Sequence, residues 1–389
     1  TQSKSFSFVL LSRVYKNKGE LELAFHYLKK AEKEAIKSEL FEVLSIIYSE
    51  IIQLSHELIS IDVDYYVDLK RDNIKLLSEL DEIDLLLAKI MYDVKTKQNF
   101  SNSKDSLIKL VKTKYTNISK HKGLVHSSQF RIRLFKMYSR LLLQERDYNR
   151  LEIFLTESYS DLKKDKIFNR SNHNEKLSIL TYLTNCFYKT KKYKKSLKYA
   201  EKLLVSMKEY DSFLYDKYLF YYYNIIVLNY AKTDKDKALL FLKKAGENAV
   251  IKKLPSYNVF IYLNKSLIYY YQNDYKESQK SIARLILQKD FLLLDKSFQL
   301  KILVANLMIR ILVSARGLDK KIEQIKKEYK SLLLKEDHIR DRKMIDILSN
   351  IICGNDISSE MKTFLSYIPD LESEDIDIIS YNNWLRINF

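Results

Sequence analysis

The sequence predicts an all-α fold in which antiparallel helix pairs stack side by side. The 389-residue chain has only five Gly and two Pro. Turns that need a positive or a fixed φ are therefore scarce, whereas β-rich and Rossmann-type chains need many of them. A pattern of large apolar and small residues also recurs along the chain at helical spacing. The 46% hydrophobic content is enough for a core that runs the length of such a stack.

The first predicted helix pair lies at residues 8–31, FVLLSRVYKNKGELELAFHYLKKA. Large apolar residues surround the small Ser12, a turn follows at Gly19, and the second helix begins its pattern with the small Ala24. Two antiparallel helices that cross closely need small residues at the crossing, and large residues fill the space on either side. Ser12 and Ala24 are therefore expected to meet.

The same pattern recurs at Leu180–Leu203 and Tyr262–Leu285, less completely at Phe135–Leu155, and as a first helix alone at Phe41–Tyr48. The stretch YLFYYYNIIVLNY, residues 218–230, fits as the first helix of another copy, buried on most of its circumference. These spacings resemble the tetratricopeptide repeat (TPR). The resemblance covers residues 5–35 and roughly 130–290. It implies a TPR-like α-solenoid whose first helices line a concave binding face.

One long helix interrupts the repeats. Residues 66–94 carry apolar side chains spaced strictly three and four apart, with Asn73 as the one polar interruption. This heptad stripe predicts a single helix at 64–97. The helix could form a homodimer as a coiled coil, or it could pack along its own chain. The second interpretation is favoured, because Ile74 and Leu77 widen the apolar face beyond a two-stranded seam.

The predicted organisation has five segments: TPR-like helices at 1–60, the long helix and a connecting helix at 61–125, TPR-like repeats at 126–290, a helical hairpin at 291–353 and a tail or cap at 354–389. The hairpin is expected to turn at Gly317. The tail holds Pro369, an acidic run and the only Trp, Trp384. It is expected to cap the last helices, with occupancy of the binding groove as the alternative.

No catalytic motif is recognisable, and an enzyme is not expected. The closest two glycines lie 37 residues apart (Gly317 and Gly354), which excludes phosphate-binding glycine loops. The six histidines form no metal-binding motif, so neither a metal nor a cofactor is predicted. Two separated cysteines and no visible signal peptide favour the cytoplasm, with a cleaved export signal left open. The longest uncharged apolar run lies between Lys217 and Lys232, too short to span a membrane.

The net charge of +17 comes mainly from lysine, and it is interpreted first as a lysine-rich solvated surface. A basic groove for an acidic peptide or a nucleic acid is the functional alternative. In TPR-like folds the concave face is lined by first-helix positions next to the packing positions, and this resemblance implies a binding groove of basic, amide and aromatic side chains. The candidate residues are Arg133, Lys136, Arg140, Thr181, Asn185, Tyr188, Lys189, Tyr221, Asn224, Lys232, Tyr270 and Tyr271.

Such a groove would favour a carboxylate-rich ligand. We therefore expect a non-enzymatic scaffold or adaptor that binds an acidic peptide or partner protein. Two alternatives stay open. The repeats could be the signal-receiving part of a regulator with an N-terminal effector, or the chain could bind nucleic acid without sequence preference through Lys and exposed Tyr.

Overall fold

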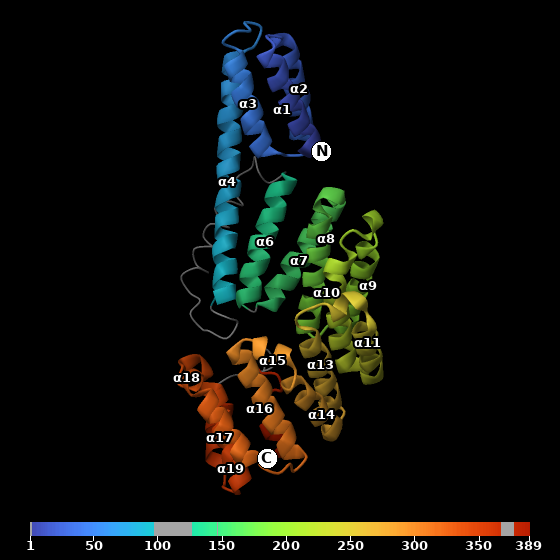
Figure 1. Cartoon of the computed structure of the whole chain (residues 1–389), viewed down its shortest axis with the longest axis vertical. Coiled ribbons are helices and arrows are strands. Elements are labelled where there is room, and N and C mark those ends of the chain that lie inside the picture. Colours follow the sequence, from blue (N-terminus) through green and yellow to red (C-terminus); the bar gives the residue numbers. More distant parts are fainter. Residues whose placement is uncertain (1, 97–126, 146, 367–376) are drawn as a thin grey trace. The chain divides into compact units, whose positions relative to one another are not determined.

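The computed structural model of the chain describes residues 2–96, 127–145, 147–366 and 377–389 (Figure 1). These residues are largely helical and include no β-strand, so the all-α prediction is confirmed for them. The chain forms two compact units that meet in sequence between Asn169 and Arg170. That boundary lies inside the segment 126–290, which the sequence predicts as one run of repeats. Each unit is described by itself.

The described part of the first unit consists of helix pairs. They are α1 (Gln2–Asn17) with α2 (Leu21–Lys37), α3 (Phe41–Leu54) with α4 (Val63–Thr96), and α6 (Ser128–Glu145) with α7 (Tyr148–Lys164). The predicted turn after α1 forms at Gly19, whose φ of +76° suits a residue without a Cβ. Ser12 and Ala24 are both buried, as close packing between α1 and α2 requires.

Helix α4 is the long helix that the heptad stripe predicts. The sequence shows no second helix of the repeat type after α3, but in the structure α4 takes that place and packs along α3. Its first half joins the core of α2 and α3 through Tyr66. Its second half packs through Leu80 and Ile83 against α6. The Asn73 amide, 4% exposed, donates to the carbonyl of Phe41 at 2.9 Å.

The heptad stripe of α4 is therefore largely buried within its own chain over the residues whose side chains are described, as the favoured interpretation predicts. Its last two positions, Ile90 and Val94, lie outside them. Homodimerisation through the 64–97 helix stays an untested prediction. The predicted connecting helix before residue 126 lies outside the described residues.

The second unit continues the helix pairs. They are α8 (His173–Lys189) with α9 (Tyr193–Met207), α10 (Tyr215–Thr233) with α11 (Lys235–Glu247), α13 (Tyr257–Tyr271) with α14 (Tyr275–Ile286), and α16 (Lys296–Leu312) with α17 (Leu318–Glu328). Short helices α12 (Ala249–Lys252), α15 (Lys289–Leu293) and α18 (Lys330–Leu333) follow three of the pairs. Helix α10 contacts both α8 and α13, so the first helices of successive pairs lie side by side.

Helix α10 contains the tyrosine-rich stretch 218–230. Six of its nineteen residues are buried, and the remaining tyrosines are half-buried or exposed. Burial raises the pKa of Tyr222 to about 12, because the phenolate would lose its hydration. In the described part of the chain, no helix is both long enough and apolar enough to cross a membrane.

Serines occupy the helix crossings in this unit. Ser196 on α9 donates to the carbonyl of Thr184 on α8 at 2.7 Å. Ser266 on α13 and Ser278 on α14 each donate to the other's carbonyl, at 3.0 and 2.8 Å. All three serines are fully buried. A serine is small enough for the crossing, and its hydroxyl forms a hydrogen bond to the partner helix.

The C-terminal end of the unit has the largest core cluster. Helix α16 packs against α17 and α19 (Ile339–Cys353), and α20 (Ser358–Leu365) and α22 (Tyr381–Asn388) complete this end. The predicted turn before α17 forms at Gly317, with a φ of +69°. Tyr381 and Trp384 of α22 are fully buried and belong to the same core cluster. Through these two side chains the described tail, 377–389, packs on the last helices, and its role as a cap stays a prediction.

Candidate functional site

The predicted groove residues fall into both units. Arg133, Lys136 and Arg140 lie on α6 of the first unit, and the other nine lie on α8, α10 and α13 of the second. The prediction that all twelve converge on one surface is therefore not supported by the described geometry, and the two sets are considered separately.

The set on α6 is partly neutralised by neighbouring carboxylates. Arg133 Nε lies 3.0 Å from Asp84 Oδ2 on α4, and its Nη2 lies 3.6 Å from Glu42 Oε1 on α3. Arg133 is thus held in ion pairs within its own unit, which corrects its assignment to an open basic groove. Lys136 and Arg140 are half-buried on the same helix.

The set in the second unit includes residues at equivalent repeat positions. Lys189 on α8, Lys232 on α10 and Tyr271 on α13 are all exposed. Each lies nine residues after the first large residue of its repeat pattern, which is Leu180, Tyr223 and Tyr262 respectively. The structure brings two of them together, because Lys232 Nζ lies 4.5 Å from the centroid of the Tyr271 ring. We call this surface the first-helix face; its members are Asn185, Tyr188, Lys189, Tyr221, Asn224, Lys232, Tyr270 and Tyr271.

The members of the first-helix face differ in exposure. Tyr221 is 47% exposed and Tyr271 37%. Tyr270 is half-buried, its ring lies edge-on to Tyr271 at 5.2 Å, and burial raises the pKa of its hydroxyl. The prediction that Thr181 lines the groove is corrected. Thr181 is 6% exposed, and its hydroxyl donates to the carbonyl of Leu177 in the same helix at 2.8 Å. Thr181 is therefore excluded from the face.

Acidic residues are nearly absent from the helices that carry the first-helix face. In α8, α10 and α13 they are Glu175 and Asp216, each in the first turn of its helix. Beyond those first turns the three helices carry lysines, amides and tyrosines as their polar side chains, together with Ser and Thr. The charged side chains that these three helices carry beyond their first turns are therefore all basic.

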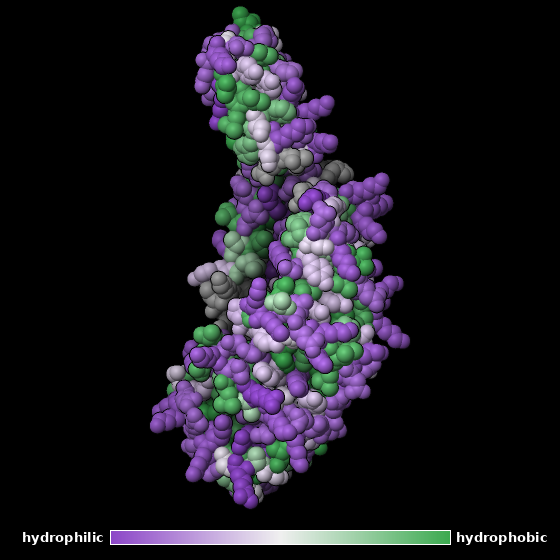
Figure 2. Space-filling model, turned by 45° about the vertical axis from the view of Figure 1, so that its right-hand side comes forward, coloured by the Kyte–Doolittle hydropathy of each residue, from purple (hydrophilic) through white to green (hydrophobic). Residues whose placement is uncertain are grey.

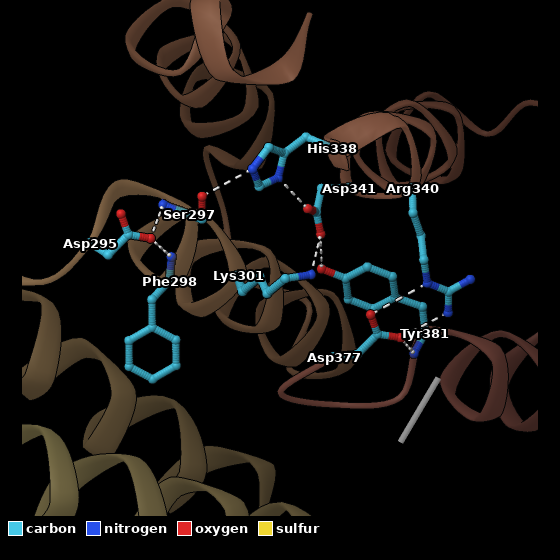
Figure 3. Close-up of polar contacts among 9 residues, drawn as sticks. All are labelled: Asp295, Ser297, Phe298, Lys301, His338, Arg340, Asp341, Asp377 and Tyr381. Atoms are coloured by element: carbon cyan, nitrogen blue, oxygen red, sulfur yellow. Dashed lines mark hydrogen bonds and ion pairs between the residues drawn. The ribbon is translucent and has the colours of Figure 1, made fainter. Parts of the chain in front are cut away.

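A second polar cluster, which sequence reasoning missed, lies in the C-terminal core (Figure 3). Ser297 Oγ lies 3.0 Å from His338 Nε2, and His338 Nδ1 lies 2.8 Å from Asp341 Oδ2. Asp341 Oδ1 also accepts from Lys301 Nζ at 3.1 Å and from the Tyr381 hydroxyl at 2.9 Å. All five side chains are at most 7% exposed.

The hydrogen-bond chain from Ser297 through His338 to Asp341 resembles that of a hydrolase triad. The groups around Ser297 and Asp341 nevertheless oppose catalysis. The backbone N–H groups of Ser297 and Phe298 both donate to the Asp295 carboxylate. An oxyanion next to Ser297 would therefore face a negative charge instead of free donors. The Lys301 ammonium also balances the Asp341 charge that would support an imidazolium. The geometry favours a structural role.

That role is to attach the tail to the last helices. Arg340 on α19 donates through Nη2 to Asp377 at 2.8 Å and to Asn382 at 3.0 Å. At Asp341, burial opposes ionisation, but hydrogen bonds from His338, Lys301 and Tyr381 and the Lys301 charge outweigh it, so the pKa of Asp341 lies below its usual value. The only signal in the sequence is the i, i+3 spacing of His338 and Asp341, which is too common to identify the cluster.

Other candidate site types receive little support from the described residues. They include no group of three or more His, Cys, Asp or Glu side chains placed to hold a metal ion. A surface hollow of about 450 Å³ is lined by Lys208, Ser212, Phe213, Tyr215 and Asp216, and it shares no residue with the first-helix face.

In sequence comparisons, no protein-family profile and no curated protein matches the chain. The candidate site therefore depends on the geometry of the first-helix face.

Proposed function

We propose that the chain is a non-enzymatic scaffold that binds an acidic segment of a partner protein on the first-helix face. The observation that carries the proposal is charge: beyond their first turns, three adjacent helices hold exposed lysines and tyrosines and no acidic side chain. A peptide carboxylate next to Lys189 or Lys232 would gain charge-assisted hydrogen bonds.

The aromatic members add contact area to this binding mode. Tyr221 and Tyr271 expose rigid rings that bury much apolar area at a small entropic cost. Lys232 lies over the Tyr271 ring, which orders the ammonium group before a ligand arrives. Amide groups at Asn185 and Asn224 can pair with a peptide backbone, although the Asn185 amide already donates to Thr181 at 3.1 Å.

We further propose that the helix pairs are TPR-like repeats. The spacing in the sequence and the serines at the crossings, Ser196, Ser266 and Ser278, support this. In repeats of this kind the first helices line the ligand-binding surface, which agrees with the position of the lysines and tyrosines on α8, α10 and α13.

The test uses charge reversal and a matched control. The full chain is titrated into a fluorescently labelled peptide of about fifteen residues rich in Glu and Asp. We expect Lys189→Glu with Lys232→Glu to weaken binding at least about tenfold, or about 1.4 kcal/mol. The same reversal at Lys194 and Lys198, exposed on the second helix α9, should change it less than about twofold. Equal losses in both variants would refute the first-helix face as the site.

Nucleic acid is the competing ligand. A single-stranded oligonucleotide of similar charge is titrated in parallel at about 50 and 200 mM salt. Binding through phosphates would fall by orders of magnitude over that range. Tighter binding of the oligonucleotide than of the acidic peptide, lost in the same Lys189→Glu and Lys232→Glu variant, would replace the peptide proposal with the nucleic-acid alternative.

A further inference from the structure

A buried histidine lies under the turn that joins α9 to α10. His173, the first residue of α8, is 1% exposed. Among the described residues, neither nitrogen of its ring has a hydrogen-bond partner. The ring instead packs edge-on against Tyr210 at 4.9 Å and lies 5.9 Å from the Phe213 ring. Buried polar groups are normally hydrogen-bonded, so the position of this imidazole calls for a physical reason.

The turn that covers the imidazole, residues 209–213, has an unfavourable backbone. Tyr210, Asp211 and Ser212 have positive φ values of 53°, 62° and 58°. Left-handed conformations are costly for residues with a Cβ and usually occur singly. The ties of the turn are weak, because Asp211 pairs with Arg170 at 3.6 Å through side chains that are both exposed. Such a backbone persists only while its surroundings hold it, and here the rings packed on the imidazole do so.

Two charged groups act on the imidazole directly. Glu209 Oε2 lies 3.8 Å from His173 Nδ1, but Lys176 of α8 already donates to both Glu209 oxygens, at 2.7 and 2.8 Å. Burial lowers the pKa of His173, the Glu209 charge raises it, the Lys176 charge lowers it and the Ser206 carbonyl raises it. The pKa of His173 consequently lies below its usual value, so the ring is neutral at pH 7.

Charged side chains on the adjoining elements offer the imidazole no partner. On the short helix η1 (Arg170–Asn172), Arg170 lies over the Phe213 ring at 5.7 Å. At the start of α10, Lys217 donates to Asn174, and Asp216 lines the surface hollow. None of them forms a hydrogen bond to the imidazole. A protonated ring would therefore have only a carboxylate that another cation already binds.

We propose that His173 and the 209–213 turn form a pH-sensitive catch, which is closed while the imidazole is neutral and opens when it is protonated. A buried imidazolium beside Lys176 would be a second cation with a shared carboxylate, which is costly. Opening lets the ring reach water and lets the turn leave its left-handed conformation. The open form therefore binds the proton more readily than the closed form.

The sign of the pH dependence follows from this difference in proton affinity. The closed form is favoured above the ordinary histidine pKa of about 6.5. Below that value the ratio of open to closed chains rises as the pH falls, by at most about tenfold per pH unit. The rise ends once the pH falls below the pKa of His173 in the closed form.

Opening would change the surface of the second unit. Ser212 and Phe213 belong to the turn and line the surface hollow, so the hollow would change shape and the half-buried Tyr210 ring would become exposed. Figure 2 turns the side of this unit with α9 and α11 toward the reader and shows hydrophilic side chains with hydrophobic areas between them. The open catch would add aromatic surface to the unit under acidic conditions.

The test is hydrogen–deuterium exchange of the full chain at about pH 7.5 and pH 5.5, corrected for the intrinsic pH dependence of exchange. We expect exchange of the amides in peptides covering 208–215 to rise at least about threefold at the lower pH. Peptides from α13 and α14, which contain no histidine, should stay unchanged, and this excludes general unfolding by acid. Equal protection of the turn at both pH values would overturn the proposal.

Two substitutions identify the titrating group. His173→Phe keeps a buried ring that cannot be protonated, so the turn should stay closed in acid. Lys176→Met removes the competing cation and leaves Glu209 to the imidazolium, so the acid response should fall to less than about half. The control His56→Gln, at an exposed position of the first unit, should respond like the unmodified chain.

The two variants remain decisive if one of them disturbs the turn. A full acid response in a closed His173→Phe chain would overturn the proposal, because another group would then titrate. If His173→Phe opens the turn at both pH values, Lys176→Met decides, and a full acid response in that variant would also overturn the proposal. A histidine that only fills space would leave the acid response independent of Lys176.

Discussion

At the scale of single residues, the helix crossings combine a steric and a polar requirement. The recurring pattern predicts small residues where the two helices of a pair approach closely, and Ser196, Ser266 and Ser278 occupy those positions. It does not predict that each hydroxyl donates to the partner helix, because the hydrogen-bonding partner is set by the register of two helices. The size of a crossing residue could thus be predicted, whereas its bonding could not.

Replacing Ser266 separates these two requirements. Ser266→Ala keeps the residue small but removes a buried hydroxyl that bonds to Ser278, which we expect to cost about 1 to 2 kcal/mol of unfolding free energy. Ser266→Leu forces a large side chain into the crossing and should cost about 3 kcal/mol or more. Urea unfolding measures both, with Ser359→Ala, exposed on α20, as the control. A smaller loss for Leu than for Ala would contradict the close crossing.

The buried carboxylate of Asp341 gives a prediction for pH. Its pKa is lowered in the folded state, so the stability it contributes is present above the unfolded pKa of about 3.9 and is lost as the pH falls through the folded value. Protonation of Asp341 should therefore weaken docking of the tail below about pH 4. Fluorescence of Trp384, the only Trp and fully buried, reports docking directly.

Substitution of Asp341 tests its ion pair with Lys301 without a pH change. Asp341→Asn leaves the Lys301 ammonium, 3% exposed, without its carboxylate, and we expect a loss of about 3 to 5 kcal/mol. Trp384 emission should shift to the red at lower denaturant concentration. Asp346→Asn, on the same helix with a half-exposed side chain, is the control. An unchanged Trp384 signal in Asp341→Asn would show that the tail docks without this network.

At the scale of elements, α4 shows what the apolar periodicity of a sequence can and cannot predict about a helix. The heptad stripe predicts one long helix, and α4 spans Val63–Thr96. The stripe does not reveal its partner, because a coiled-coil seam and a side packed on its own chain need the same apolar spacing. The structure supplies the partners, α3 for the first half and α6 for the second.

The packing of α4 predicts the effect of shortening one stripe residue. Leu80 is fully buried against α6, so Leu80→Ala should destabilise the first unit by about 3 kcal/mol and leave the oligomeric state unchanged. Ile74→Ala, at a position 48% exposed, should cost less than about 1 kcal/mol. Urea unfolding and sedimentation measure the two effects. Conversion of a dimer to a folded monomer by Leu80→Ala would support the coiled-coil alternative.

At the scale of the whole molecule, the fold class was predictable and the candidate site was predictable only in part. The scarcity of Gly and Pro and the recurring pattern suffice for an all-α chain of paired helices. The unit boundary after Asn169 depends on tertiary contacts that no local pattern records. For the same reason the sequence grouped Arg133 with Lys189 and Lys232. Arg133 lies in the first unit, where it is paired with Asp84, and the two lysines lie in the second.

The central claim is that the first-helix face binds an acidic segment, and lysine footprinting by acetylation and mass spectrometry tests it most directly. The full chain is acetylated with and without a saturating Glu- and Asp-rich peptide. We predict that the peptide protects Lys189 and Lys232 and leaves Lys194 and Lys198 of α9 unchanged. Protection confined to α9, or no protection of Lys189 and Lys232 at saturation, would contradict the claim.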